Sequence, residues 1–339
     1  MSQHIVQSLN DIYTKLNHIG YDEKFIRKSV LPEWWDDRDS DDPTDIMRFT
    51  TIVSRNLGLD VHSLMDKRQT VKPNSKLTGK FKMARNLETS EVINAQIIAA
   101  SVAKYIVRAC KCDYKGTPET GKVVNDTILS KCHHVELMNL VDYCWSIGIP
   151  VIYIKGFDKK YSNMDGMALY VEGRPAIILN KHKQKKEPWY LFTLAHELAH
   201  IIAGHVNEET TAIVDNLYHD ADKIQSDEEF DANDIATEII TGNRYKSFHQ
   251  YRRVLTAEKL ANFANSVCEI EEVSPGFVVL NYAKVMTSKQ FNAYPTAQKA
   301  LGIMDVKEID PSLLSSILYS NIDTEEIPEE SQRFITSMV

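Results

Sequence analysis

Three residues in the middle of the sequence have the types and the spacing of a hydrolytic metal site. His196 and His200 lie four positions apart, and Glu197 directly follows the first histidine. On a helix this spacing places both imidazoles on one face, about 6 Å apart along the axis, so both can reach one zinc ion at about 2.0–2.1 Å. Glu197 would lie beside the metal, where its carboxylate can take a proton from water and pass it to a leaving amine. We therefore predict Zn²⁺ as cofactor and Glu197 as the catalytic residue.

A third protein ligand is needed, because a catalytic zinc site holds three protein ligands and leaves one position for water. His205 is a weak candidate. It lies five residues after His200, directly behind Gly204, whereas a third histidine that follows a glycine turn usually lies six residues after the second. We expect His205 to lie beside a ligand or at the helix terminus, where a cationic side chain is favoured.

The stronger candidates for the third ligand are acidic residues that open a downstream helix. They are Glu228, Glu229 and Asp231. Acidic residues in a first helical turn are common for dipole reasons alone, so their position does not separate the three. Glu229 shares a helix face with Asn233, and we expect the Asn233 amide to orient a ligand histidine.

The elements that must position these residues follow from hydrophobic periodicity and from turn residues. The motif helix is predicted to begin at Pro188 and to end near Gly204. Upstream, β-branched runs predict strands, and Glu172-Gly173-Arg174-Pro175 predicts a hairpin turn between the second and the third. The strands are expected at residues 151–154, 167–171 and 176–179. Helices are expected at residues 5–30, 44–56, 89–110, 137–147 and 227–240.

The order of these elements predicts an α+β protein that is mainly helical. The stretch at residues 113–126 contains two glycines and a proline and is the best candidate for a domain boundary. We predict a helical N-terminal domain of unknown role at residues 1–125 and a metallopeptidase domain with a small β-sheet at residues 126–285. Residues 286–339 are predicted to form a partly helical C-terminal tail.

Composition restricts the class of protein. The 339-residue chain has a formal net charge of −8, which argues against strong direct nucleic-acid binding. It contains no run of 18 apolar residues and no signal-like start, so we expect no membrane association. The five cysteines are sparse and irregularly spaced, which is typical of reduced thiols in a cytoplasmic protein.

Two further groups of residues were weighed as sites. Cys110-x-Cys112 with Cys132, His133 and His134 suggests a second zinc site, but the spacing is not the usual pair of Cys-x2–4-Cys motifs. We favour ordinary thiols for these cysteines. Tyr218 and His219 follow the motif helix at a distance that suits a transition-state stabiliser.

Parts of the chain resemble the ImmA/IrrE family of bacterial metallopeptidases. The matching segments are His-Glu-Leu-Ala-His-Ile-Ile-Ala-Gly-His at 196–205, Ala-Ile-Ile-Leu-Asn at 176–180, Glu-Phe-Asp-Ala-Asn-Asp-Ile-Ala at 229–236 and Ser-Pro-Gly at 274–276. Together they span about residues 130–285. The resemblance implies a zincin-like fold and favours Glu229 as the third metal ligand. Where family members usually continue into Leu-Met-Pro, this chain has Ile239-Ile240-Thr241-Gly242.

The resemblance also implies a class of substrate. Members of the family tend to cleave or antagonise a regulator, often a helix-turn-helix repressor, in stress responses, mobile-element control or toxin–antitoxin pairs. We therefore expect a zinc endopeptidase that acts on one protein partner, a transcriptional regulator or an antitoxin. The alternative is a zinc-binding interaction module, a sensor or toxin component that works without proteolysis.

Overall fold

The structure is a computed structural model of the whole chain. It describes residues 8–36, 42–74, 81–82, 90–155, 165–180, 185–208, 212–215, 226–249 and 254–339. Within these ranges most residues lie in helices, and the strands form one small sheet. The fold is therefore α+β and mainly helical, with the small β-sheet that the sequence predicts.

The described strands form a five-stranded mixed sheet in the order β1-β5-β3-β4-β2. Their bounds are β1 (Phe81–Lys82), β2 (Val151–Ile154), β3 (Gly166–Val171), β4 (Arg174–Asn180) and β5 (Ala212–Asp215). Strand β4 pairs with β2 in parallel and with β3 in antiparallel register. The sequence pattern identified the neighbouring strands β2, β3 and β4, but it did not predict β1 or β5.

The hairpin between β3 and β4 is tighter than we expected. Only Glu172 and Gly173 form the turn, and both have positive φ, at 52° and 84°. Two positive φ values are typical of the two-residue type I′ turn, whose twist matches that of the flanking strands. Arg174 and Pro175, which we had placed in the turn, belong to β4, where Pro175 pairs with Tyr170.

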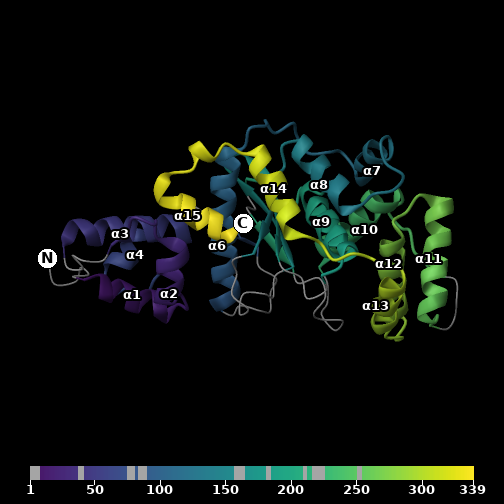
Figure 1. Cartoon of the computed structure of the whole chain (residues 1–339), viewed down its shortest axis with the longest axis horizontal. Coiled ribbons are helices and arrows are strands. Elements are labelled where there is room, and N and C mark those ends of the chain that lie inside the picture. Colours follow the sequence, from purple (N-terminus) through teal and green to yellow (C-terminus); the bar gives the residue numbers. More distant parts are fainter. Residues whose placement is uncertain are drawn as a thin grey trace.

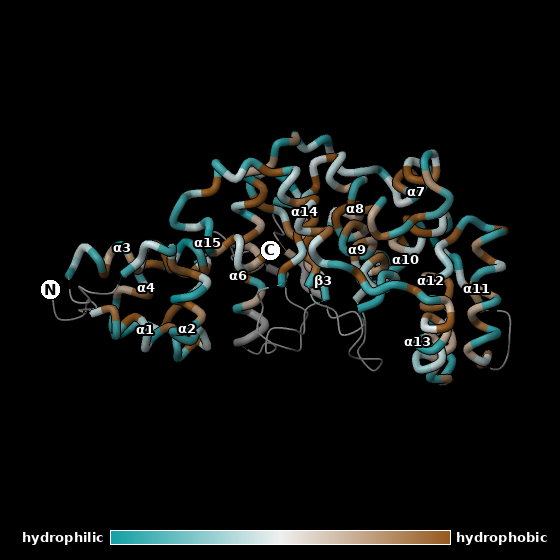
Figure 2. Tube along the Cα trace, viewed as in Figure 1, coloured by the Kyte–Doolittle hydropathy of each residue, from teal (hydrophilic) through white to brown (hydrophobic). Residues whose placement is uncertain are grey.

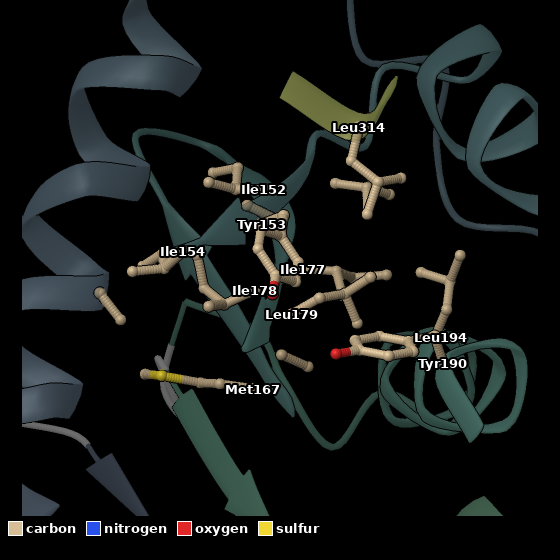
Figure 3. Close-up of a cluster of buried hydrophobic side chains, with 14 of the residues drawn as sticks. Ile152, Tyr153, Ile154, Met167, Ile177, Ile178, Leu179, Tyr190, Leu194 and Leu314 are labelled. Atoms are coloured by element: carbon tan, nitrogen blue, oxygen red, sulfur yellow. The ribbon is translucent and has the colours of Figure 1, made fainter. Parts of the chain in front are cut away.

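Two long helices enclose the sheet, with α6 (Ser90–Ala109) and α9 (Glu187–Ile202) packed against β3 and β4 (Figure 1). Because both faces are covered, the strand residues are nearly all buried. Figure 3 shows the core between the strands and α9, where Tyr190 and Leu194 approach Ile177, and Leu314 closes one end from α14 (Pro311–Asn321). Helix α9 is therefore held by core packing along its length.

Further helices surround α9 on its other sides. Helices α8, α10 and α12 contact α9 directly, α7 packs on α10, and α11 and α13 pack on α12. Their bounds are α7 (Gly121–Leu129), α8 (Leu137–Ser146), α10 (Asp227–Thr241), α11 (Ala257–Glu271), α12 (Pro275–Ser288) and α13 (Tyr294–Ile303). Helix α7 begins inside the stretch at residues 113–126 that we had interpreted as a boundary. The centre of the molecule, around β3 and α9, is mostly apolar (Figure 2).

The N-terminal helices form one end of the molecule (Figure 1). They are α1 (Leu9–His18), α2 (Glu23–Phe25), the π-helix η1 (Ile26–Val30), α3 (Pro43–Leu57) and α4 (Val61–Met65). In Figure 2, α1 and α3 alternate between polar and apolar residues, as expected for amphipathic helices that bury one face. The helical N-terminal region agrees with the sequence pattern.

The C-terminal elements return to this N-terminal end. After α14 the chain forms η3 (Thr324–Glu326) and α15 (Glu329–Met338), and α15 packs against η1, α3 and α6. The Ser331 hydroxyl donates to Asn56 Oδ1 at 2.7 Å and lies 2.9 Å from the Tyr105 hydroxyl. The domain boundaries near residues 125 and 285 stay predictions, although α15 joins parts of the chain that we had assigned to different units.

No helix within the described ranges is both long and apolar enough to cross a lipid bilayer. All five cysteines are free of disulfide bonds.

Candidate metal centre and active site

Helix α9 holds the sequence motif in a fully buried position. His196, Glu197 and His200 have no exposed surface. The helix begins with proline near its N-terminus, and it is apolar around its whole circumference, which is typical of a helix enclosed by other elements. The two histidines are therefore fixed one helical turn apart by packing around the helix.

Helix α10 brings the third candidate ligand to these histidines. The Ser226 side chain caps the helix by accepting from the Glu229 backbone N–H at 3.3 Å, and three acidic residues in the first turn match the helix dipole. The Glu229 carboxylate lies 3.4 Å from His196 Nε2 and 3.5 Å from His200 Nε2. Of the three acidic candidates left open by the sequence, the structure places Glu229 with the histidines.

The spacing of the three ligand atoms suits a tetrahedral metal ion. His196 Nε2 and His200 Nε2 lie 3.1 Å apart, His196 Nε2 lies 3.4 Å from Glu229 Oε2, and His200 Nε2 lies 3.5 Å from Glu229 Oε1. Ligands bound at about 2.0–2.1 Å in tetrahedral geometry lie about 3.3–3.4 Å from one another. Two imidazoles and one carboxylate are also a known ligand set of catalytic zinc. The residues present therefore fit the metal that the sequence implies.

Glu197 lies between α9 and the start of β3. A Cβ atom built on Gly166 would overlap the Glu197 carboxylate and would lie 2.7 Å from Thr193 Cγ2. Only glycine allows the strand backbone to approach the helix this closely. Gly166 therefore determines the space that the carboxylate of the predicted catalytic residue occupies.

His205 contacts a ligand histidine, as we expected from its place after the helix. Its Nδ1 lies 3.0 Å from His200 Nδ1, and its Nε2 lies 3.8 Å from Asp231 Oδ2. Asp231 in turn pairs with Arg244. For His200 Nε2 to face the metal with a lone pair, its Nδ1 must carry the proton and donate it to His205 Nδ1. His205 then points its own Nε2–H at Asp231.

Asn233 has a different role from the one we expected. Among the described residues, its Nδ2 donates to the Glu229 backbone carbonyl at 2.8 Å, and its Oδ1 accepts from Lys284 Nζ at 3.0 Å. The expectation that it orients a ligand histidine is therefore corrected. Lys284 lies on α12, with its Nζ 5.2 Å above the Phe192 ring.

Several residues that line this region were not found from the sequence. Gly166 had one signal, a single glycine at the start of a strand, which often marks a close backbone approach. Arg244 and Lys284 had none, because their partners lie 13 and 51 residues away. The candidate stabilisers Tyr218 and His219 lie outside the described residues.

Comparison with known protein families agrees with this geometry. Residues 144–262 match the model of peptidase family M78, described as the IrrE N-terminal-like domain. The chain carries an ImmA/IrrE-family peptidase domain. The IrrE-like domain includes β2 to β5, α9 and α10, and thus His196, Glu197, His200 and Glu229. No curated protein and no solved structure matches the chain.

This match supports a metallopeptidase domain and, with it, a metal ion. It covers a narrower part of the chain than the resemblance in the sequence, which extended over about residues 130–285. The Ser-Pro-Gly segment at 274–276 lies beyond it. There Gly276 allows α12 to begin against the Pro188 ring, because a Cβ at this position would overlap that ring.

Proposed function

We propose that this protein is a zinc-dependent endopeptidase that hydrolyses a peptide bond in one protein partner. The observation that carries the proposal is the position of the Glu229 carboxylate of α10, whose oxygens lie 3.4 and 3.5 Å from the Nε2 atoms of His196 and His200, two buried histidines on the helix that also holds Glu197. His196, His200 and Glu229 are the proposed zinc ligands, and Glu197 is the proposed catalytic residue. Glu197 also favours hydrolysis over a purely structural zinc, which needs no such carboxylate.

The side chains divide the work of the reaction. Zinc bound by the three ligands would polarise the substrate carbonyl and lower the pKa of water. The Glu197 carboxylate accepts the proton of the attacking water and passes it to the leaving amine nitrogen. The proton on His200 Nδ1 stays with the ring because His205 Nδ1 accepts from it, so His200 Nε2 keeps its lone pair for the metal.

A protein partner suits the surface beside the site. Phe230, directly after Glu229 in α10, is 57% exposed, so an apolar side chain lies at the surface next to a proposed ligand. The proposed partner is a transcriptional regulator, such as a helix-turn-helix repressor, or an antitoxin, which is the class that the family resemblance implies. The chain's five free thiols agree with a cytoplasmic setting for this reaction.

The test combines metal analysis with Glu197→Gln. The probe is a peptide library made from a bacterial proteome, in which new N-termini are identified by mass spectrometry. The variant should bind zinc as the wild type does and should lose about 10²–10⁴-fold in cleavage rate, because the amide cannot accept the proton. Glu228→Gln, a neutralisation of the same type beside Glu229, is the matched control and should retain cleavage.

Equal cleavage by Glu197→Gln and wild type would contradict the proposal. Zinc binding without cleavage by the wild-type protein, together with unchanged biological activity of Glu197→Gln, would favour the interaction module instead. A regulator encoded beside this chain and co-expressed with it provides the second substrate. Its cleavage by wild type and its survival with Glu197→Gln would support both the reaction and the class of partner.

A further inference from the structure

A second group of metal-binding side chains lies outside the proposed active site. His133, His134 and Cys268 each offer one ligand atom, and these atoms all lie within 4.8 Å of one another. The histidines lie in the short turn between α7 and α8, and Cys268 lies near the end of α11. We name these three residues the turn cluster. Segments 134 residues apart thus meet with the donor types that bind zinc.

The turn that carries the two histidines is held by hydrogen bonds from both sides. The Cys132 backbone N–H donates to Ile128 O at 3.1 Å, at the end of α7. Asn139 in α8 donates from its side chain to His134 O at 3.3 Å and accepts from the Glu136 backbone N–H at 2.9 Å. The histidine pair is therefore presented by a structured turn and not by an unrestrained loop.

The partners of His134 select the tautomer that a metal ligand needs. Glu136 Oε1 lies 2.9 Å from His134 Nε2, so Nε2–H donates to the carboxylate. Nδ1 then carries the lone pair, and it faces Cys268 Sγ at 3.8 Å. A carboxylate that accepts from the far nitrogen of a ligand histidine is the usual support of zinc-binding imidazoles.

The distance between Cys268 Sγ and His134 Nδ1 is close to the distance between two ligand atoms of one zinc ion. A thiolate at about 2.3 Å and an imidazole at about 2.05 Å from one tetrahedral ion lie about 3.5 Å apart. Glu272 supplies a candidate fourth ligand, because it lies one helical turn after Cys268 and its Oε1 is 3.8 Å from His133 Nδ1. His133 is well exposed and can rotate to complete the set.

From this geometry we propose that His133, His134 and Cys268 form a second zinc site, with Glu272 or water as the fourth ligand. One thiolate and two imidazoles favour a borderline-soft divalent ion over magnesium or calcium. On binding, the Cys268 thiol releases its proton to solvent and the thiolate coordinates the ion. The ion would join the α7–α8 turn to the end of α11.

This site contains a different cysteine from those in the second zinc site that the sequence suggests. Cys110 and Cys112 have other contacts. The Cys110 backbone forms an isolated antiparallel β-bridge with Ile322, and the Cys112 thiol lies 3.7 Å from Trp145 O. The cysteine that lies beside the two adjacent histidines is Cys268 of α11. All three members also lie outside residues 144–262, so the IrrE-like match does not assign them.

The experiment uses the full chain, stripped of metal by a chelator and titrated with Co²⁺ as a visible substitute for zinc. His196, His200 and Glu229 include no thiolate, so a thiolate-to-cobalt charge-transfer band reports the turn cluster alone. The wild type should bind two equivalents and show this band. Cys268→Ser should bind one equivalent and lose it. Cys132→Ser, which changes the cysteine next to His133, is the matched control and should keep both.

A second variant separates metal binding from folding. Glu136→Gln keeps a side-chain oxygen that can accept from His134 Nε2–H but removes the negative charge of the carboxylate. It should weaken binding at the turn cluster about 10–100-fold while the band at saturation stays. Zinc should also raise the melting temperature of the wild type more than that of Cys268→Ser, because binding to the folded state alone stabilises it.

Three results would overturn the site. The first is a wild-type protein without the band. The second is a band that persists in Cys268→Ser, and a simultaneous loss of the band in Cys132→Ser would assign it to Cys132 instead. The third is a wild-type protein that binds a single equivalent of Co²⁺. If Cys268→Ser does not fold, which far-ultraviolet circular dichroism detects, His134→Gln takes its place with the same expected loss. The result is independent of cleavage, so it does not depend on the proposed peptidase activity.

Discussion

The two groups of metal-binding side chains in this protein differ in how their geometry is maintained. His196 and His200 are fully buried on a long helix, their Nε2 atoms lie 3.1 Å apart, and the Glu229 carboxylate lies 3.4 to 3.5 Å from them. The turn cluster lies at the surface, where the His133 side chain is 59% exposed, and its atoms lie within 4.8 Å. The first group is already spaced for an ion, whereas the second must close around one.

The two groups differ in what orders their ligand side chains: core packing in the first and metal binding in the second. Core packing around α9 orders the buried ligands during folding, so binding a metal there orders few further groups. At the turn cluster part of the binding free energy must order His133, which lowers the affinity. We therefore expect the buried group to act as the permanent site and the turn cluster to exchange its metal more readily.

The largest expected effect comes from disturbing the buried group without touching a ligand. Gly166→Ala places a methyl group where the Glu197 carboxylate and Thr193 lie. The displaced carboxylate should lose proton transfer, with a fall in cleavage rate of about a hundredfold or more. Zinc content and the charge-transfer band of the turn cluster should not change. The measurement is the cleavage rate beside metal analysis of the same sample.

Gly302→Ala in α13 is the control, because a Cβ there meets no atom within 4 Å. It should leave cleavage unchanged and is expected to raise stability by up to about 1 kcal/mol, since alanine favours a helix over glycine. Full activity in Gly166→Ala would mean that the strand can yield and that Gly166 does not set the position of Glu197.

The next prediction concerns Glu187, which links the helix of the buried group to the residues that support the turn cluster. Glu187 begins α9, and its Oε1 accepts from the Leu137 backbone N–H at 2.7 Å, next to the Glu136 that supports His134. Burial raises the pKa of Glu187 from 4.5 to about 7. The hydrogen bond from Leu137 opposes this rise in pKa, and the charge of Glu136 adds to it. In the unfolded chain the carboxyl group loses its proton near 4.5, whereas in the folded protein it keeps the proton to about 7.

Stability should therefore fall as pH rises through this window, because the folded state binds the extra proton. The pKa difference corresponds to about 3 kcal/mol. Glu187→Gln, which is neutral throughout, should lack this loss when metal-free proteins are unfolded in urea on both sides of the window. The exposed Glu258 in α11 provides the control, and Glu258→Gln should follow the wild type. If the free energy of unfolding depends on pH equally in Glu187→Gln and in the wild type, Glu187 is not the source of that dependence.

A smaller effect concerns the support behind the ligand histidines. In the buried group His205 accepts from His200, whereas in the turn cluster the Glu136 carboxylate supports His134. Removing such a partner typically lowers metal affinity about 10–100-fold. His205→Ala should therefore weaken zinc at the buried group alone, as measured by competition with a chromophoric chelator. His205→Gln, which keeps an acceptor, should recover part of the affinity.

His62→Ala, on α4 and remote in sequence, is the control for the loss of one histidine. Unchanged zinc affinity in His205→Ala would mean that core packing alone orients His200. That outcome would make the difference between the two groups larger than we propose.

Local sequence patterns predicted much of the fold and of the buried group. Periodicity and end signals located α9 and α10, and the spacing of His196 and His200 follows from helix geometry alone. The choice of Glu229 over Glu228 and Asp231 did not follow from the pattern, because all three suit a first helical turn. It came from the family resemblance, and the structure places Glu229 with the histidines.

Contacts between distant segments escaped the sequence analysis. His133 and His134 gave a weak signal, but Cys268 joins them only because α11 folds back on the α7–α8 turn. Likewise, strand β1 is two residues long, which is too short to show a period. The pairs Asp231–Arg244 and Asn233–Lys284 depend on tertiary packing that no local pattern records.

The hydrogen bonds between α15 and α3 have a consequence for the synthesis of this protein. Asn56 and Ser331 are 275 residues apart, so at about 5–20 residues per second the ribosome completes α3 roughly 14–55 s before Ser331 is made. During that time Asn56 and Tyr105 can bond to each other, and Asn56 to Val30 O, but both lack the Ser331 hydroxyl, and the apolar face that α15 covers is open to chaperones. The N-terminal helices therefore complete their packing only after the peptidase domain has emerged.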